Sequence, residues 1–166
     1  MANESYVSKG AALKINGEGD ADYAWSVEGV INLEGRVSAQ IDLGAAPRPA
    51  HYAWSVKLQL QATPTQYASV ELYKAGAPDG DSTQIDGDVG ASDAALGGPD
   101  QRFNLQFIGR VVSENAAASE VLVASGVFVH TERYLTLVAY NVTGAAVDAT
   151  DSNFVFILQP VFWQIQ

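Results

Sequence analysis

The side chains best suited to general-base chemistry are His51 and His130, the only two histidines of the sequence. A histidine can activate a serine, and many hydrolases present that serine in a Gly-x-Ser-x-Gly turn. The sequence contains neither such a turn nor a cysteine. His51 follows Arg48-Pro49-Ala50 and is interpreted as a surface turn residue, and His130 is interpreted as the edge residue of an apolar strand. We therefore predict that the protein is not an enzyme and has no catalytic residue.

A second candidate chemistry is cation binding by two Asp-Gly-Asp sequences, at residues 79–81 and 86–88. Calcium takes several oxygen ligands, which flexible acidic loops can provide. The spacing does not fit an EF-hand, because Gln84 stands where glycine is needed and Gly90 where a glutamate is needed. Asp-Gly is also a common turn sequence. We expect solvated turns without metal or cofactor, and the candidate ligands for a bound cation are Asp79, Asp81, Asp86 and Asp88.

A third chemistry is the stacking of sugar rings on exposed aromatic side chains, for which Trp25 and Trp54 are the candidates. The competing interpretation places these indoles in a core or an interface, where Trp and Tyr of all-β proteins are usually found. Carbohydrate binding is therefore kept as an alternative function, and it requires both tryptophans to lie at the surface.

The elements that must position these residues are β-strands. In residues 55–61, apolar Val56, Leu58 and Leu60 alternate with polar residues, as in a strand with one buried face. Turn-forming clusters separate further runs of this kind, which is typical of a sandwich or barrel. The predicted strands cover residues 29–34, 37–43, 69–74, 103–107, 121–129, 134–141 and 154–158. We predict one all-β domain over residues 1–166.

The predicted architecture is an antiparallel, jelly-roll-like β-sandwich with one long acidic loop. That loop is rich in Gly and Asp and covers about residues 76–102. The short segment 113–120 is expected to be a connection.

The C-terminal segment is unusually apolar. Both alternating faces of residues 154–158 are apolar, which predicts a strand that is covered on both faces. Pro160 is expected to end the pairing and redirect the chain. Large apolar side chains continue almost to the last residue and favour docking on a neighbouring subunit. The predicted interface residues are Phe154, Phe156, Val161, Phe162, Trp163 and Ile165.

Charge and composition narrow the range of partners. A formal net charge of −10 and the absence of a basic run argue against binding to nucleic acid or to an anionic membrane. No apolar run has the length of a membrane-spanning helix, and the N-terminus does not resemble a secretory signal. The lack of cysteine excludes disulfides and is compatible with folding in a reducing cytoplasm.

The second half of the chain contains a series of short motifs in a characteristic order. They are Ser125-Gly126-Val127-Phe128-Val129, Arg133-Tyr134, residues 140–147 and the final stretch 156–161, preceded by an Asp-Gly-Asp loop and Arg102-Phe103-Asn104-Leu105. This series resembles small structural proteins of tailed bacteriophages. Phe162-Trp163 departs from the more polar ending of that group.

The resemblance implies a virion component assembled in the cytoplasm of a bacterial host. The leading hypothesis is a jelly-roll capsid decoration, or cement, protein that binds and stabilises the shell of the major capsid protein. We expect it to form a homo-oligomer, with a trimer as the working hypothesis. The alternative is a carbohydrate- or receptor-binding sandwich of a phage tail or fibre.

Overall fold

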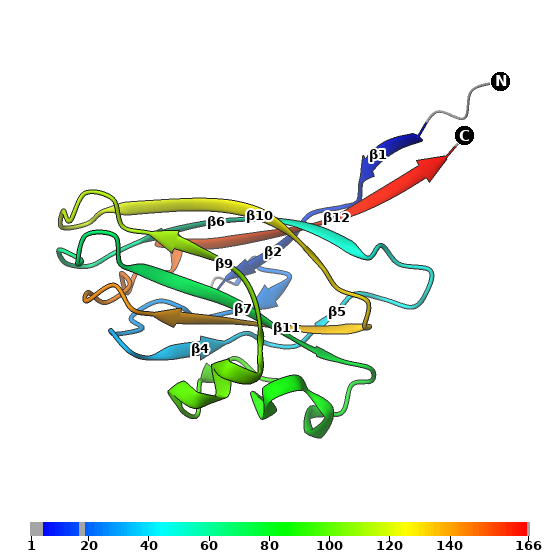
Figure 1. Ribbon diagram of the computed structural model, residues 1–166, viewed down its shortest axis with the longest axis horizontal. Helices are drawn as coiled ribbons and strands as arrows, with labels where there is room; N and C mark the ends of the chain where they lie inside the picture. The colour runs from blue at the N-terminus through cyan, green and yellow to red at the C-terminus, as the bar shows by residue number, and fades with distance from the viewer. Residues whose placement is uncertain (1–4, 17–18, 166) are drawn as a thin grey trace.

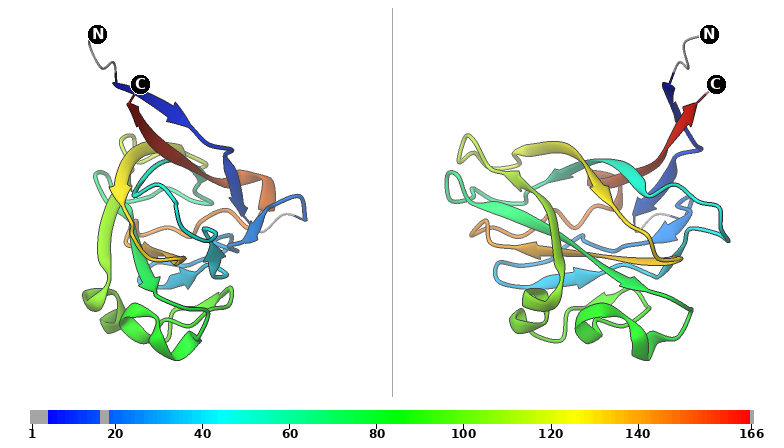
Figure 2. Two further views of the ribbon diagram at one scale, coloured as in Figure 1. Left: turned by 90° about the vertical axis from the view of Figure 1, so that its right-hand side faces the viewer. Right: turned by 45° about the vertical axis from the view of Figure 1, so that its right-hand side comes forward.

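The computed structural model describes residues 5–16 and 19–165, with the side chains of these residues except 5–7, 82 and 163–165. Two sheets face one another with the core between them (Figures 1 and 2). Sheet A has the order β10-β6-β12-β2-β3, and β1 also pairs with β12. Its strands are β1 (Ser5–Lys9), β2 (Leu13–Asn16), β3 (Tyr23–Ala24), β6 (His51–Gln59), β10 (Val121–Val129) and β12 (Phe154–Ile165).

Sheet B has the order β8-β4-β11-β7-β9, and β5 also pairs with β11. Its strands are β4 (Gly35–Val37), β5 (Ile41–Asp42), β7 (Ser69–Ala77), β8 (Ala94–Ala95), β9 (Gln106–Val112) and β11 (Tyr134–Asn141). The described helices are the short 3-10 turns η1 (Ser82–Gln84), η2 (Asp86–Asp88), η3 (Pro99–Asn104) and η4 (Asp151–Asn153). No helix in the described ranges is long and apolar enough to cross a membrane.

The strand order is that of a jelly roll, as the sequence predicted. Along the chain, the eight principal strands are β2, β4, β6, β7, β9, β10, β11 and β12. Sheet A contains the first, eighth, third and sixth of them, and sheet B contains the second, seventh, fourth and fifth. All pairs within these two sets are antiparallel, which is the arrangement of two interleaved Greek keys.

The core is built from the inward residues of both sheets and from Trp25, which lies in the connection between β3 and β4. The Trp25 indole packs edge-on against Phe154 and Phe156, with ring centroids 5.4 Å away in both cases. Trp54 of β6 stacks on Phe156 at 5.9 Å. A Cβ atom on Gly126 would lie 2.8 Å from the Trp54 indole, and a Cβ atom on Gly109 would lie 2.5 Å from it. The two glycines therefore let this ring close the side of the sandwich between β10 and β9.

The two sheets differ in what covers their outer faces. Residues 78–105, which we term the covering segment, pack against the outside of sheet B through Ile85 and Val89 (Figure 1). As a result, every residue of β11 from Leu135 onward is buried. In β10 of sheet A, by contrast, buried residues alternate with exposed ones. The long acidic loop of the sequence prediction is thus this covering segment.

Four local predictions were wrong. The predicted strand 37–43 is divided between the last residue of β4 and the two-residue β5, with no strand at 38–40. Residues 29–34 form turns instead of a strand, with positive φ at Gly29 and Leu33. The stretch at 103–107 is divided between η3 and the start of β9. Pro160 does not end the pairing of β12, since it lies opposite Tyr52 of β6 and its carbonyl accepts a hydrogen bond from the Gly10 amide at 2.9 Å.

Candidate functional site

The tryptophans proposed for sugar stacking are not at the surface. Trp25 is 0% exposed and Trp54 is 5% exposed. The Trp25 Nε1 donates a hydrogen bond to the Arg36 carbonyl at 3.1 Å, and the indole is packed in the core described above. The prediction of a sugar platform at Trp25 and Trp54 is therefore wrong, because their neighbours in the fold already occupy the stacking surfaces.

The predicted interface residues separate into two groups. Phe154 and Phe156 are fully buried in the core of their own chain, so neither can contact a neighbouring subunit. Their strand is covered on one face only, since Val155 and Ile157 are half-buried. Val161 is half-buried, and Phe162 is 37% exposed. The side chains of Trp163 and Ile165 lie outside those that the structure describes.

The described carboxylates of the Asp-Gly-Asp sequences accept hydrogen bonds from nearby residues of the chain. The Asp79 carboxylate accepts from the Asp81 amide at 3.0 Å, and Asp81 accepts from both the amide and the hydroxyl of Thr83 at 2.9 Å. These bonds lower the pKa of Asp81. The Asp86 carboxylate accepts from the Gly76 amide at 3.2 Å and so connects the covering segment to β7. Within the described ranges, no group of three or more His, Asp or Glu residues is arranged to hold a metal ion.

The second histidine belongs to a buried polar pair. Lys74 and His130 are 8% and 3% exposed, and the Lys74 Nζ lies 3.2 Å from the His130 Nδ1. The other ring nitrogen, Nε2, lies 3.0 Å from the Tyr134 carbonyl oxygen, which can only accept. His130 therefore carries its proton on Nε2 and accepts a hydrogen bond from the Lys74 ammonium at Nδ1. Both ring nitrogens are engaged within the protein.

Burial dominates the electrostatics of this pair. Burial, together with the nearby Lys74 charge, lowers the pKa of His130 to about 4. Burial also lowers the pKa of Lys74, against the opposing influence of the Glu132 and Asp86 carboxylates. The pair lines a pocket of about 310 Å³ together with Asp86 and Glu132. The Glu132 carboxylate is close to Gly76, where a Cβ atom would overlap it.

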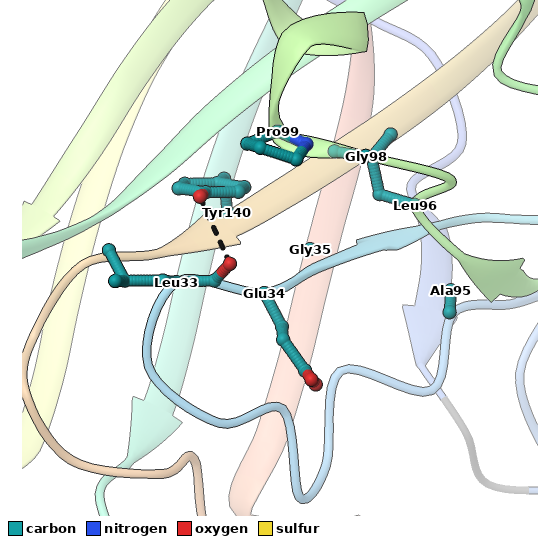
Figure 3. Close-up of a pocket in the computed structure, with 8 residues that line it drawn as sticks. All are labelled: Leu33, Glu34, Gly35, Ala95, Leu96, Gly98, Pro99 and Tyr140. Carbon is teal, nitrogen blue, oxygen red and sulfur yellow. Dashed lines mark hydrogen bonds between the residues drawn. The ribbon is translucent and has the colours of Figure 1, made fainter.

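A smaller pocket lies between the β4 end of sheet B and the covering segment (Figure 3). Its volume is about 210 Å³. The Tyr140 hydroxyl donates a hydrogen bond to the Leu33 carbonyl at 3.0 Å, and the Arg102 guanidinium lies 3.9 Å from the centre of the Tyr140 ring. In Figure 3 the Glu34 carboxylate points away from Tyr140. The polar groups of Tyr140 and Arg102 are thus used for internal contacts.

The most distinctive feature of the outline is a two-stranded projection, which we term the terminal arm. It consists of β1 and residues 161–165 of β12, which pair antiparallel with Ser5 opposite Ile165 and Lys9 opposite Val161. The arm extends away from the two sheets (Figures 1 and 2). The pairing of β12 with β6 ends at Val161, so β12 has only β1 beside it further along the arm.

A groove lies at the base of the terminal arm. It has a volume of about 370 Å³, and its apolar lining includes Pro47, Pro160 and Phe162. Tyr52 also lines it, and the Tyr52 hydroxyl is buried without a hydrogen-bond partner among the described residues. Burial raises the pKa of Tyr52, and the Arg48 charge opposes this effect. The proline rings and the exposed Phe162 ring make the lining of this groove largely apolar.

A further apolar surface was missed by the sequence analysis. The outward residues of β10 include Val121, Val123, Val127 and Val129, which are 49%, 71%, 62% and 48% exposed; we term them the valine face. The β-branched and aromatic residues of this segment predict the strand, but the sequence analysis does not identify its outward side as a surface. The signal was present in the sequence, because a strand with one solvated face normally carries polar residues there.

No protein-family model and no curated protein matches the sequence. Among solved structures, murine APRIL is similar with a TM-score of 0.43 and 8% identity over 74% of this chain and 70% of that one. The C-terminal domain of EclA, a sugar-binding protein, is similar with a TM-score of 0.34 and 15% identity over 93% of this chain and 77% of that one.

Proposed function

We propose that this protein is a non-enzymatic structural component of a tailed-bacteriophage virion and that it decorates the capsid. In this role it binds the shell of the major capsid protein and stabilises the contacts between shell subunits. The proposal is supported by the order of motifs in the second half of the chain and by the jelly-roll fold. The observation that carries it is the terminal arm with the groove at its base.

The arm has the properties of an attachment element. A two-stranded ribbon is marginally stable by itself in water, because it buries little surface on either face. Docking on another protein would bury the exposed Phe162 ring and cover the outer edges of the ribbon.

The charge of the protein agrees with this mode of attachment. A net charge of −10 makes free copies repel one another and keeps them soluble before assembly. Attachment through one short arm is weak per copy, but a shell offers many equivalent sites, so several linked contacts reinforce one another. With Trp25 and Trp54 buried, no specific observation favours the carbohydrate-binding alternative.

The test is co-expression with the major capsid protein encoded in the same genome, followed by sedimentation of assembled shells and cryo-electron microscopy. We expect the protein to sediment with the shells and to appear as density on their surface, with the arm in contact with a capsid subunit. Phe162→Asp should abolish the association, and Tyr67→Asp is the matched control. Tyr67 is 73% exposed and lies in the connection between β6 and β7. Absence of the protein from purified shells, or equal binding by both variants, would refute the proposal.

A further inference from the structure

We propose that the valine face of β10 is a self-association surface, through which two copies of this chain form a dimer about a twofold axis at Ser125. The strand is the edge of sheet A and, among the strands that the structure describes, pairs only with β6. Its nine residues include no charged residue and no proline. Natural proteins normally protect such an edge with lysine, proline, a bulge or a covering element. The dimer is inferred independently of the capsid role.

The valine face is exposed, whereas the outer face of sheet B is covered. The covering segment buries the outside of sheet B, while the four valines of β10 are about half exposed or more. On the neighbouring strand β6, the outward positions beside these valines are His51, Ala53, Ser55, Lys57 and Gln59, so the exposed apolar surface is largely that of β10 itself. A row of exposed apolar side chains at the surface is typical of an interface between proteins.

The sequence of β10 indicates a second copy as the partner. Read outward from Ser125, the strand is nearly palindromic, since it reads Val-Leu-Val-Ala-Ser-Gly-Val-Phe-Val. A twofold contact requires a self-complementary surface, in which one residue meets a second and the second meets the first. With two β10 strands antiparallel about Ser125, Val121 faces Val129 of the second copy, and Val123 faces Val127 of the second copy. These are matched apolar pairs with no opposed charges.

The distribution of charge supports the same partner. The covering segment contains Asp79, Asp81, Asp86, Asp88, Asp93 and Asp100 and lies against sheet B, on the far side of the molecule from the valine face (Figure 1). On the strand next to β10, the outward position opposite Val123 is Lys57. A twofold contact through β10 therefore keeps the two acidic surfaces apart, which limits repulsion between copies that each carry −10.

The size of the face predicts a weak dimer. A nine-residue strand is about 30 Å long and three strands are about 14 Å wide, which gives about 400 Å² in projection. Stable interfaces bury about 800 Å² per partner, so a contact of this size is about half of a standard interface and falls among weak, transient ones. We expect a monomer–dimer equilibrium with a dissociation constant in the micromolar range. The twofold contact would also replace the trimer expected from the sequence.

The experiment is sedimentation velocity of the full chain from about 1 µM to about 100 µM, a range that brackets a micromolar dissociation constant. The mass should rise with concentration from 17.6 kDa toward twice that value. Val123→Lys should weaken dimerisation by about tenfold or more, since it places a charge in the centre of the contact. Phe103→Lys is the matched control, because Phe103 is 73% exposed and belongs to the covering segment. It should leave the equilibrium unchanged.

A second variant keeps the test decisive if Val123→Lys lowers the melting temperature. The chain has no cysteine, so Ser125→Cys introduces one thiol at the proposed axis. A short bismaleimide should crosslink this variant into dimers, while Thr83→Cys, an exposed position in the covering segment, should stay monomeric. A protein that remains monomeric throughout, forms trimers, or crosslinks equally through both thiols overturns the inference.

Discussion

Replacing His130 by glutamine is expected to make the free energy of unfolding less dependent on pH between pH 7 and pH 4. His130 is 3% exposed and neutral at pH 7, with Nε2 donating to the Tyr134 carbonyl and Nδ1 accepting from Lys74. Protonation of Nδ1 would remove that acceptor and place two positive charges 3.2 Å apart in a buried site. Folding therefore opposes protonation of this ring.

The magnitude follows from proton linkage. Burial and the Lys74 charge lower the pKa of His130 from 6.5 to about 4. Between these values the unfolded chain binds a proton that the folded chain does not bind, so the free energy of unfolding falls as the pH falls. One pKa unit corresponds to about 1.4 kcal/mol, which gives a loss of about 3 kcal/mol between pH 7 and pH 4 from this residue alone.

The assay is urea denaturation of wild type and His130→Gln between pH 7 and pH 4, with the pKa of His130 measured by NMR titration. Glutamine retains an acceptor for Lys74 but does not titrate, so the wild-type free energy should fall by about 3 kcal/mol more than that of the variant. Lys74→Met is the companion variant: it removes the charge and leaves the burial, so it should raise the pKa of His130 only in part. Parallel profiles for wild type and His130→Gln would refute the reasoning.

Three further predictions concern stability and attachment. Gly109→Ala should destabilise the fold by about 1–3 kcal/mol, because the new Cβ overlaps the buried Trp54 indole; Gly19→Ala, which has open space, is the control in thermal melts. Glu120→Gln should lower the free energy of unfolding by about 1–3 kcal/mol at pH 7, because the buried Glu120 carboxylate accepts three hydrogen bonds. In denaturation experiments below pH 4.5, this difference between wild type and variant should become smaller. Deleting Val161–Gln166 should leave a folded jelly roll that melts within a few degrees of wild type in calorimetry but no longer sediments with capsid shells.

The direction of the Glu120 prediction follows from its environment. Burial by itself raises the pKa of this carboxyl, but the hydrogen bonds from the Ser113 hydroxyl and from the Glu114 and Asn115 amides outweigh that effect and lower it. Its stabilisation is therefore complete above the ordinary pKa of 4.5 and is lost as the pH falls through the lowered value. A constant difference between wild type and Glu120→Gln at all pH values would contradict this account. For the arm deletion, loss of cooperative melting would contradict the prediction that the arm lies outside the folded core.

Much of the sandwich could be predicted from local sequence. Apolar and polar residues alternate in β6, while β10 and β11 are rich in β-branched and aromatic residues, and the structure places strands in all three segments. Residues 29–34 show the limit of this signal. The alternation is present, but Ile31 and Leu33 are exposed and the chain turns at Leu33 with φ of 65°. Periodicity records which residues could share a face, and turn geometry decides whether they do.

The surfaces were harder to predict than the strands, since burial depends on contacts between distant segments. Trp25 and Phe154 are more than a hundred residues apart in the sequence and meet in the core. The residue type of an aromatic side chain does not distinguish that position from a surface platform. Pro160 was expected to end the strand because it lacks an amide donor. Its carbonyl still accepts from Gly10, and the strand continues into the terminal arm.

Both proposed contact surfaces belong to sheet A, and β12 is the strand that connects them. Its Phe156 and Leu158 side chains are anchored in the core, so the direction of the terminal arm is fixed by the sandwich. The outward Ile157 of the same strand lies opposite Ser55 of β6, and Ser55 lies opposite Ser125 of β10. In sheet B, the covering segment already buries outward residues of β4, β7 and β11. A dimer formed through β10 would therefore present two arms in a fixed mutual orientation, and shell binding by wild type should exceed that of a monomeric Val123→Lys protein with an intact arm.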